Sequence, residues 1–341
     1  MKFRAAIMYL FSVILCIGAV VFCAVSYIKF KAAPLTVPKT ATPVSESAKA
    51  ASEPEKTEKS TTKSTSSTEK KAVAAAASGQ ATTKIKAVTL THSNANLYYN
   101  NVHIKNNTGV KIDLKSLLTA KLKFKINKGN TPQILIMHTH TTECFLNEDR
   151  NYCTSSDKSR TTDNSKNVVA VGNVLANVLK KSGYAVIHDT SVHDYPSYSG
   201  SYSRSANTVI KNLSKYKNIK IVIDLHRDAF GGDERIKPIA KINGKTAAQV
   251  MLVMGSNTGT VKNHKNWQEN LKLATKFQQT MEVMYPTLVR TMSVNSAKYN
   301  QNLSSGSILL EVGTEVNTLE QAKYSATLVG NALVSLLNTI K

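Results

Sequence analysis

Histidine and acidic side chains follow directly after a short apolar run near the middle of the sequence. The run reads ILIM, and His138, His140 and Glu143 occupy positions within the six residues that come next. Imidazole nitrogens and carboxylate oxygens are the ligands of catalytic zinc sites, which use three of them and leave one position for water. Two further apolar runs end similarly, IVIDL before His226 and ILL before Glu311. The pattern indicates a hydrolytic metal site assembled from distant parts of the chain.

These apolar runs are predicted strands of an α/β domain in which strands and helices alternate. The predicted strands are 134–137, 184–187, 219–226, 248–255 and 306–313, and the predicted helices are 167–183, 203–216, 267–284 and 319–339. Such alternation is typical of a three-layer, mostly parallel sheet with helices on both faces. Ligands collect at the carboxyl ends of parallel strands. We therefore expect the histidines and glutamates to converge at one edge of the sheet.

Several residues beside these histidines have more than one interpretation. Cys144 would serve as a thiol nucleophile only with a histidine base in reach, and the nearby histidines serve a metal better. Cys144 and Cys153 lie nine positions apart, which leaves both a disulfide and two free thiols open. Arg227 and Asp228 follow His226 directly and would either contact charged groups of a substrate or form salt bridges at the rim.

The N-terminal part is predicted to tether the domain to a membrane. Residues 5–28 form an uncharged apolar run of 24 residues, which at about 1.5 Å per residue in a helix spans the roughly 30 Å hydrocarbon core. A secretory signal peptide has a shorter apolar region of about 7 to 15 residues, so an uncleaved anchor is the better interpretation. Residues 1–4 are then a cytoplasmic tail, and the bulk of the chain is expected outside the cytoplasm.

The next stretch is predicted to be a disordered linker. Residues 29–86 contain eleven lysines, five glutamates and almost no aromatic or large aliphatic side chains. Such a composition cannot bury enough apolar surface to offset the entropy of ordering the chain. An extended lead-in at 87–131 and the catalytic domain at 132–341 follow it.

The charge of the chain restricts its partners. The 341 residues carry a net charge of +22 at pH 7. The folded part lacks the long Lys and Arg cluster or the aromatic and basic motif of a nucleic-acid-binding protein, so we expect no nucleic acid. An anionic surface outside the cytoplasmic membrane, either lipid headgroups or cell-wall polymer, is the expected partner.

Four segments together resemble one known family. PQILIMHTHTTECF, IVIDLHRDA, YNQNLSSG and ILLEVGTEVN are similar to segments of the stage II sporulation protein P family of endospore-forming bacteria. That family is a divergent relative of the zinc-dependent N-acetylmuramoyl-L-alanine amidases. The likeness extends over residues 100–340, and the anchor and linker also match the family's layout.

The resemblance implies roles for individual residues. It places His140 and His226 on the two zinc histidines of the amidases and Glu311 on their catalytic glutamate. The carboxylate ligand of the amidases would fall near Ser165, which cannot replace it. Glu143 is the predicted substitute and Asp163 the alternative, while His138 is expected to orient a ligand by a hydrogen bond rather than to bind the metal.

The resemblance also implies an activity and partners. The expected reaction is zinc-dependent cleavage of the amide between N-acetylmuramic acid and L-alanine in peptidoglycan. A second endopeptidase activity on peptide cross-links is implied as well. Stage II sporulation proteins D and M are the implied partners, in septal wall remodelling and engulfment of the forespore between the two membranes. The alternative is a membrane-tethered scaffold that binds the wall without catalysis.

Overall fold

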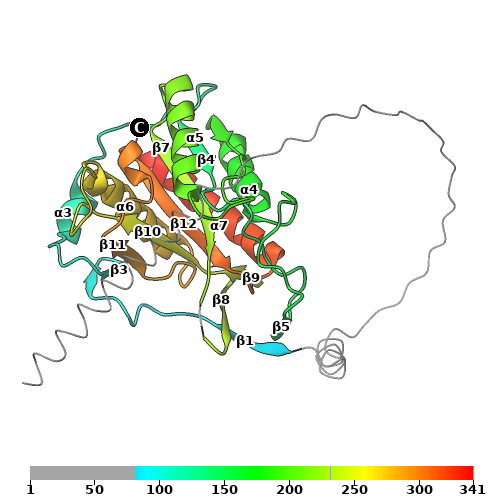
Figure 1. Ribbon diagram of the computed structural model, residues 1–341. Coiled ribbons are helices and arrows are strands. Elements are labelled where there is room, and N and C mark those ends of the chain that lie inside the picture. Colours follow the sequence, from blue (N-terminus) through cyan, green and yellow to red (C-terminus); the bar gives the residue numbers. More distant parts are fainter. Residues whose placement is uncertain (1–80, 231, 341) are drawn as a thin grey trace, which may run out of the picture. The chain divides into compact units, whose positions relative to one another are not determined.

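The computed structural model of the chain describes residues 81–230 and 232–340 (Figure 1). The predicted cytoplasmic tail, the predicted anchor at 5–28 and most of the predicted linker lie outside these ranges. Among the helices that the two ranges contain, none has the length and apolar character needed to span a bilayer.

The main sheet has eight strands and mixed direction. Its spatial order is β2 (Leu97–Tyr99), β3 (Val102–Asn106), β11 (Met292–Asn295), β10 (Val250–Gly255), β12 (Ser307–Thr314), β7 (Ile221–Asp228), β4 (Ile134–Met137) and β6 (Val186–His188). The β2–β3 and β10–β12 pairs are antiparallel and the other five pairs are parallel. This agrees with the mostly parallel sheet that the alternating strand and helix pattern predicts.

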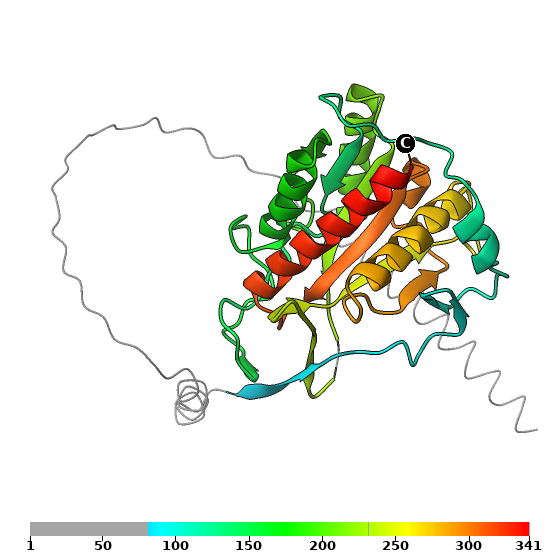
Figure 2. The same ribbon diagram turned by 180° about the vertical axis from the view of Figure 1, so that it is seen from behind.

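Helices cover both faces of this sheet. Helices α4 (Val168–Lys181), α6 (Trp267–Met284) and α7 (Leu319–Thr339) lie across the face seen in Figure 2, and α5 (Ser201–Lys215) lies on the opposite face. The side chains of β4 alternate accordingly, because successive residues of a strand point to opposite faces. Ile134 and Ile136 belong to the larger core under α4, α6 and α7, whereas Leu135 and Met137 pack in the smaller core with Val209 of α5. All four are buried, which explains the uninterrupted apolar run.

A smaller sheet lies beside the main one. Its order is β5 (Tyr152–Thr154), β1 (Thr82–Val88), β8 (Arg235–Ile242) and β9 (Lys245–Ala248). β8 and β9 were not predicted from the sequence, although Asn243 and Gly244 form the turn between them with positive φ angles of 47° and 75°. An Asn-Gly pair between two strands is a strong hairpin signal because both residues tolerate such angles.

Two segments differ from what the sequence predicts. β1 begins at Thr82, inside the predicted linker, and pairs with both β5 and β8. The segment KIDLKSLL, expected to be extended, instead holds the short helix α3 (Leu114–Thr119), which begins after Asp113 because its carboxylate accepts a hydrogen bond from Ser116 N at 3.1 Å. The remaining element is a 3₁₀ turn, η1 (Gln301–Leu303).

Three neighbouring strands position the candidate site. β12, β7 and β4 lie side by side and run parallel. Their carboxyl ends therefore meet at one edge of the sheet, and the residues that follow them come together there.

Candidate functional site

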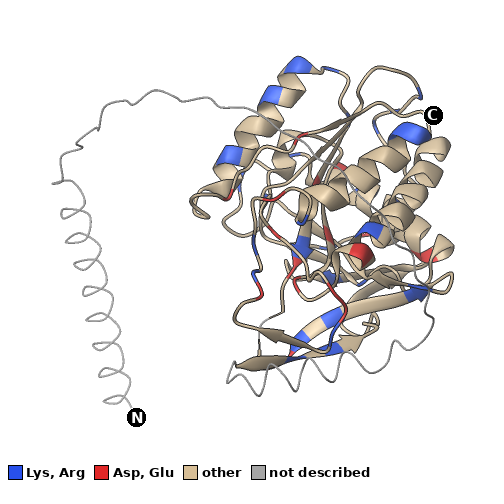
Figure 3. Cartoon of the chain, turned by 90° about the vertical axis from the view of Figure 1, so that its right-hand side faces the viewer, with Lys and Arg blue, Asp and Glu red and all other residues tan. Residues whose placement is uncertain are grey.

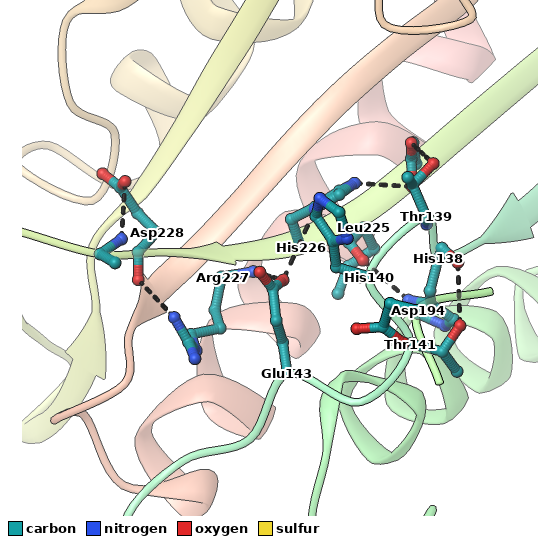
Figure 4. Close-up of polar contacts among 12 residues, drawn as sticks. His138, Thr139, His140, Thr141, Glu143, Asp194, Leu225, His226, Arg227 and Asp228 are labelled. Carbon is teal, nitrogen blue, oxygen red and sulfur yellow. Dashed lines mark hydrogen bonds and ion pairs between the residues drawn. The ribbon is translucent and has the colours of Figure 1, made fainter. Parts of the chain in front are cut away.

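Strand register places Glu311 beside His226. The two residues are direct partners across the parallel β12–β7 pair, so their side chains project from the same face of the sheet. Asp224, two residues before His226, projects from that face as well. This is the face that α5 covers, and Figure 4 shows the histidines and Glu143 gathered at the end of β7.

His226 is buried between two carboxylates. Its Nδ1 lies 3.5 Å from Glu143 Oε2, and its Nε2 lies 2.9 Å from Asp224 Oδ1, without the alignment of a hydrogen bond. Burial lowers the pKa of His226, but the charges of Asp224 and Glu143 outweigh it and hold the pKa well above its ordinary value. Asp224 also accepts hydrogen bonds from Thr139 N at 2.8 Å and Thr139 Oγ1 at 2.6 Å, which tie the end of β4 to β7.

His140 faces His226 and is kept neutral. The two rings are edge to face with their centroids 5.2 Å apart. His140 Nε2 lies 3.1 Å from the Tyr198 hydroxyl, whereas the buried Nδ1 has no partner among the described residues. Burial is the main reason that the pKa of His140 falls to about 4. A neutral imidazole with an unshared nitrogen is the form that binds a metal.

Glu143 contacts two arginines as well as His226. Its Oε2 accepts a hydrogen bond from the backbone N–H of Arg227 at 3.1 Å, and its Oε1 lies 3.5 Å from Arg160 Nη2. Burial works against a charge on this carboxyl, but His226 and then Arg227 hold its pKa below the ordinary value. Glu143 is thus a carboxylate beside the histidines.

Glu311 has the environment of a group that exchanges a proton near neutral pH. Its Oε2 is buried and has no hydrogen-bond partner among the described residues. Burial raises the pKa of Glu311 to about 8, with Asp228 and Glu143 adding to the rise and His226 opposing it. A carboxyl with a pKa near neutrality both takes up and releases a proton under working conditions.

The side chains gathered here are of the types that bind a metal ion. His140 Nδ1 and Glu311 Oε2 are buried polar atoms that both lack a hydrogen-bond partner in the described ranges. Buried polar atoms are normally paired, so two such atoms on residues that neighbour His226 suggest a further charged group. No group of three or more His, Cys, Asp and Glu side chains in those ranges already has the geometry of a metal shell.

The two alternative ligands lie in other surroundings. His138 uses both ring nitrogens, Nδ1 with Leu225 O at 2.8 Å and Nε2 with His188 Nε2 at 2.8 Å. Burial lowers the pKa of His138 to about 3. Asp163 is exposed, and its carboxylate accepts from Ser165 N at 2.9 Å and pairs with Lys166 at 3.1 Å. The structure thus brings Glu143, rather than either alternative, beside His226.

The remaining candidates have structural contacts of their own. Arg227 donates to the backbone oxygens of Cys144 at 3.2 Å and Ser159 at 2.7 Å, and Asp228 pairs with Arg290 at 2.9 Å. Cys144 and Cys153 are both free thiols, and Cys144 Sγ donates to Lys158 O at 3.0 Å.

Four residues around the site were not predicted from the sequence. Asp224 was within reach of prediction, because alternation along IVIDLH puts it on the same face as His226. Tyr198, whose ring stacks on His140 at 4.6 Å, and the ion pair of Arg160 with Asp194 come from loops without periodicity. No local sequence signal marks those three.

Comparisons with known proteins decide the family. The sequence profile of the stage II sporulation protein P family matches residues 25–334. The chain belongs to this family. It is 30% identical over 213 residues to stage II sporulation protein P of Bacillus subtilis (strain 168), an alignment that covers 59% of this chain and 50% of that protein. The chain therefore spans about half the length of the curated relative that it matches.

Two solved structures show a distant likeness to this family member. One is an N-acetylmuramoyl-L-alanine amidase from Clostridium difficile 630, with 16% identity, a TM-score of 0.38, and coverage of 62% of this chain and 100% of that one. The other is the CwlD amidase of Clostridioides difficile in complex with the GerS lipoprotein, with 13% identity, a TM-score of 0.37, and coverage of 61% and 99%. Because both TM-scores are low, the α/β assignment rests on the sheets and helices of the chain itself.

Proposed function

We propose that this family member is a membrane-tethered, zinc-dependent peptidoglycan hydrolase that cleaves the amide between N-acetylmuramic acid and L-alanine during sporulation. The observation that carries the proposal is the meeting of His140, Glu143 and His226 with Glu311 at the ends of three adjacent strands. Membership in the stage II sporulation protein P family supports the substrate and the setting.

In this proposal His140, Glu143 and His226 hold the metal, and Glu311 moves the proton. Zinc bound there would polarise the scissile carbonyl and lower the pKa of water towards about 7. Glu311, with its unpaired Oε2, accepts the proton of the attacking water and passes it to the leaving amine. Asp224 holds the His226 ring from the side away from Glu143.

The surroundings in the cell are part of the same proposal. We place the domain outside the cytoplasmic membrane, behind the predicted anchor at 5–28 and the predicted linker at 29–86. Partnership with stage II sporulation proteins D and M follows from the family likeness. Co-purification of each protein with the full chain, compared with an unrelated membrane protein of similar charge, tests that partnership.

The test of the activity is release of stem peptides from purified sacculi. We expect the full chain in detergent with added zinc to release them, and His226→Ala to release none, because a ligand is lost. Mass spectrometry of the products identifies the bond, since amidase action frees an N-terminal L-alanine whereas cleavage of cross-links does not. A wild-type protein that binds sacculi but releases nothing would favour the non-catalytic scaffold instead.

A further inference from the structure

A cavity of about 540 Å³ lies beside the candidate site, between the segment that follows Cys153 and the smaller sheet. Its walls include Thr83 of β1, Arg235 of β8 and Glu315 after β12, together with Lys158 and Arg160. Figure 3 shows Lys and Arg positions recurring on the strands of the smaller sheet. We call this cavity the basic groove.

Arg160 joins the basic groove to the candidate site. Its Nη2 lies 3.5 Å from Glu143 Oε1, and its guanidinium carbon lies 4.8 Å from the centre of the Tyr198 ring, which in turn stacks on His140. The groove is therefore separated from the carboxylate that we assign to the metal only by the Arg160 side chain.

The acidic residues of the groove are already paired. Asp157 pairs with Arg150 and accepts from Thr154 N at 2.6 Å. Glu315 lies 3.5 Å from Arg235 and 4.0 Å from Arg227. Both negative charges are thus offset by arginines.

The basic residues, by contrast, keep donors accessible. The Arg235 side chain remains 40% exposed and the Arg160 side chain 36% exposed although each has a carboxylate partner. Lys158 is exposed, and its Nζ forms no hydrogen bond or ion pair with any residue that the structure describes. Guanidinium and ammonium groups with free N–H donors bind carboxylates through charge-assisted hydrogen bonds. The groove is therefore suited to an acidic, extended ligand.

We propose that the basic groove binds the carboxylates of the peptidoglycan stem peptide and so fixes which way the substrate lies across the site. The peptide side of the scissile amide points towards Lys158 and Arg235, and the sugar side points away, past Tyr198. This inference rests on the proposed function. It adds a substrate requirement, namely free carboxylates on the peptide.

Two soluble substrates test the requirement. Each is N-acetylmuramic acid carrying a stem peptide, one with free carboxylates and one with those carboxylates amidated. We expect Lys158→Gln and Arg235→Gln, in the full chain, to raise KM for the free acid on the order of tenfold, which corresponds to about 1.4 kcal/mol of binding. The kcat of both variants and their KM for the amidated substrate should stay near the wild-type values.

The matched control is Lys217→Gln. Lys217 is also exposed, but it precedes β7 and so lies at the opposite edge of the sheet from the site. Equal rises of KM for both substrates in Lys158→Gln, or an effect of Lys217→Gln as large as that of Lys158→Gln, would overturn the groove assignment.

A binding measurement separates this inference from the hydrolase proposal. Calorimetric titration of the free stem peptide into Glu311→Gln requires no turnover. Binding that weakens about tenfold when Lys158→Gln is added supports the groove even if the wild-type chain hydrolyses neither substrate. Binding that is unchanged by Lys158→Gln and by Arg235→Gln overturns the groove even if hydrolysis is observed.

Discussion

The candidate site and the basic groove are neighbours, yet their residues are brought together by different means. His226 and Glu311 are adjacent because backbone hydrogen bonds set the register of β7 and β12. Lys158 and Arg235 line the same cavity. Lys158 comes from a loop, and Arg235 comes from β8 of the smaller sheet. Position is therefore set by the backbone in the first region and by side-chain reach in the second. We therefore expect substitutions in the candidate site to abolish hydrolysis, and substitutions in the basic groove to weaken substrate binding by degrees.

The sharpest difference should appear with Glu311→Gln. An amide at this position cannot accept the proton, so we expect kcat to fall by about 10²- to 10⁴-fold. Bound zinc should stay at the wild-type level, because Glu311 is not one of the proposed ligands. Steady-state release of stem peptide and metal analysis of the same sample check both points. Glu320→Gln is the control, since that side chain is 79% exposed on α7, and a comparable loss there would contradict the assignment.

The ligand assignment is tested by a pair of carboxylate removals. We expect Glu143→Ala to lose bound zinc and activity, because its Oε2 lies 3.5 Å from His226 Nδ1. Asp163→Ala should keep both, since its carboxylate is engaged by Ser165 and Lys166. Inductively coupled plasma mass spectrometry of the two purified proteins measures their zinc content. Full zinc occupancy in Glu143→Ala would remove this residue from the site.

A smaller effect on zinc affinity is expected from Asp224, which contacts the proposed ligand His226. Asp224→Asn removes the charge that lies 2.9 Å from His226 Nε2, and loss of such a supporting carboxylate typically weakens metal binding 10- to 100-fold. Competition with a chromophoric chelator measures the change. Asp228→Asn, on the same strand but paired with Arg290, is the matched control. Equal zinc affinity in the two variants would show that Asp224 does not support His226.

Packing under the site gives a test through stability. A methyl group added at Gly172 of α4 would lie 2.6 Å from His188 Nε2 and 2.9 Å from His138 Cε1. We expect Gly172→Ala to lower the free energy of unfolding by about 1 to 3 kcal/mol, as overpacking does. Gly330→Ala on α7 meets Val178 at 2.8 Å and should destabilise the protein without disturbing His138. Only Gly172→Ala should also lower the hydrolytic activity. Equal activity in the Gly172→Ala and Gly330→Ala variants would show that His138 does not support the site.

The smallest effect concerns pH. Burial holds the pKa of His138 at about 3 and that of His188 at about 4, both below the ordinary 6.5. As the pH falls from about 6.5 to about 3, these two histidines bind protons in the unfolded chain but stay neutral in the folded chain. The free energy of unfolding therefore decreases over this range. Urea denaturation at several pH values measures the slope. His188→Gln should flatten it, and an unchanged slope would assign the dependence to other groups.

Much of the main sheet could be predicted from the sequence because its strands are buried on both faces. The bounds of α6 and α7 agree with the predicted 267–284 and 319–339. The short strand β11 and the smaller sheet were missed, since their strands are short or carry lysine and arginine on one side. The meeting of His140, Glu143, His226 and Glu311 followed from strand ends, although their roles remain predictions. Arg160 and Tyr198 reach the site from loops, and no periodic pattern locates them.

The pairing of β1 has a mechanical consequence. The chain enters the described domain at this strand, and β1 pairs with β5 through residues 82–84 and with β8 through residues 85–88. A pull along the strand from the proposed membrane tether would load those bonds together in shear rather than opening them one after another. β1 belongs to the smaller sheet, whereas His226 and Glu311 lie on the larger one. Tension on a membrane tether would therefore be borne first by the smaller sheet, beside β7 and β12.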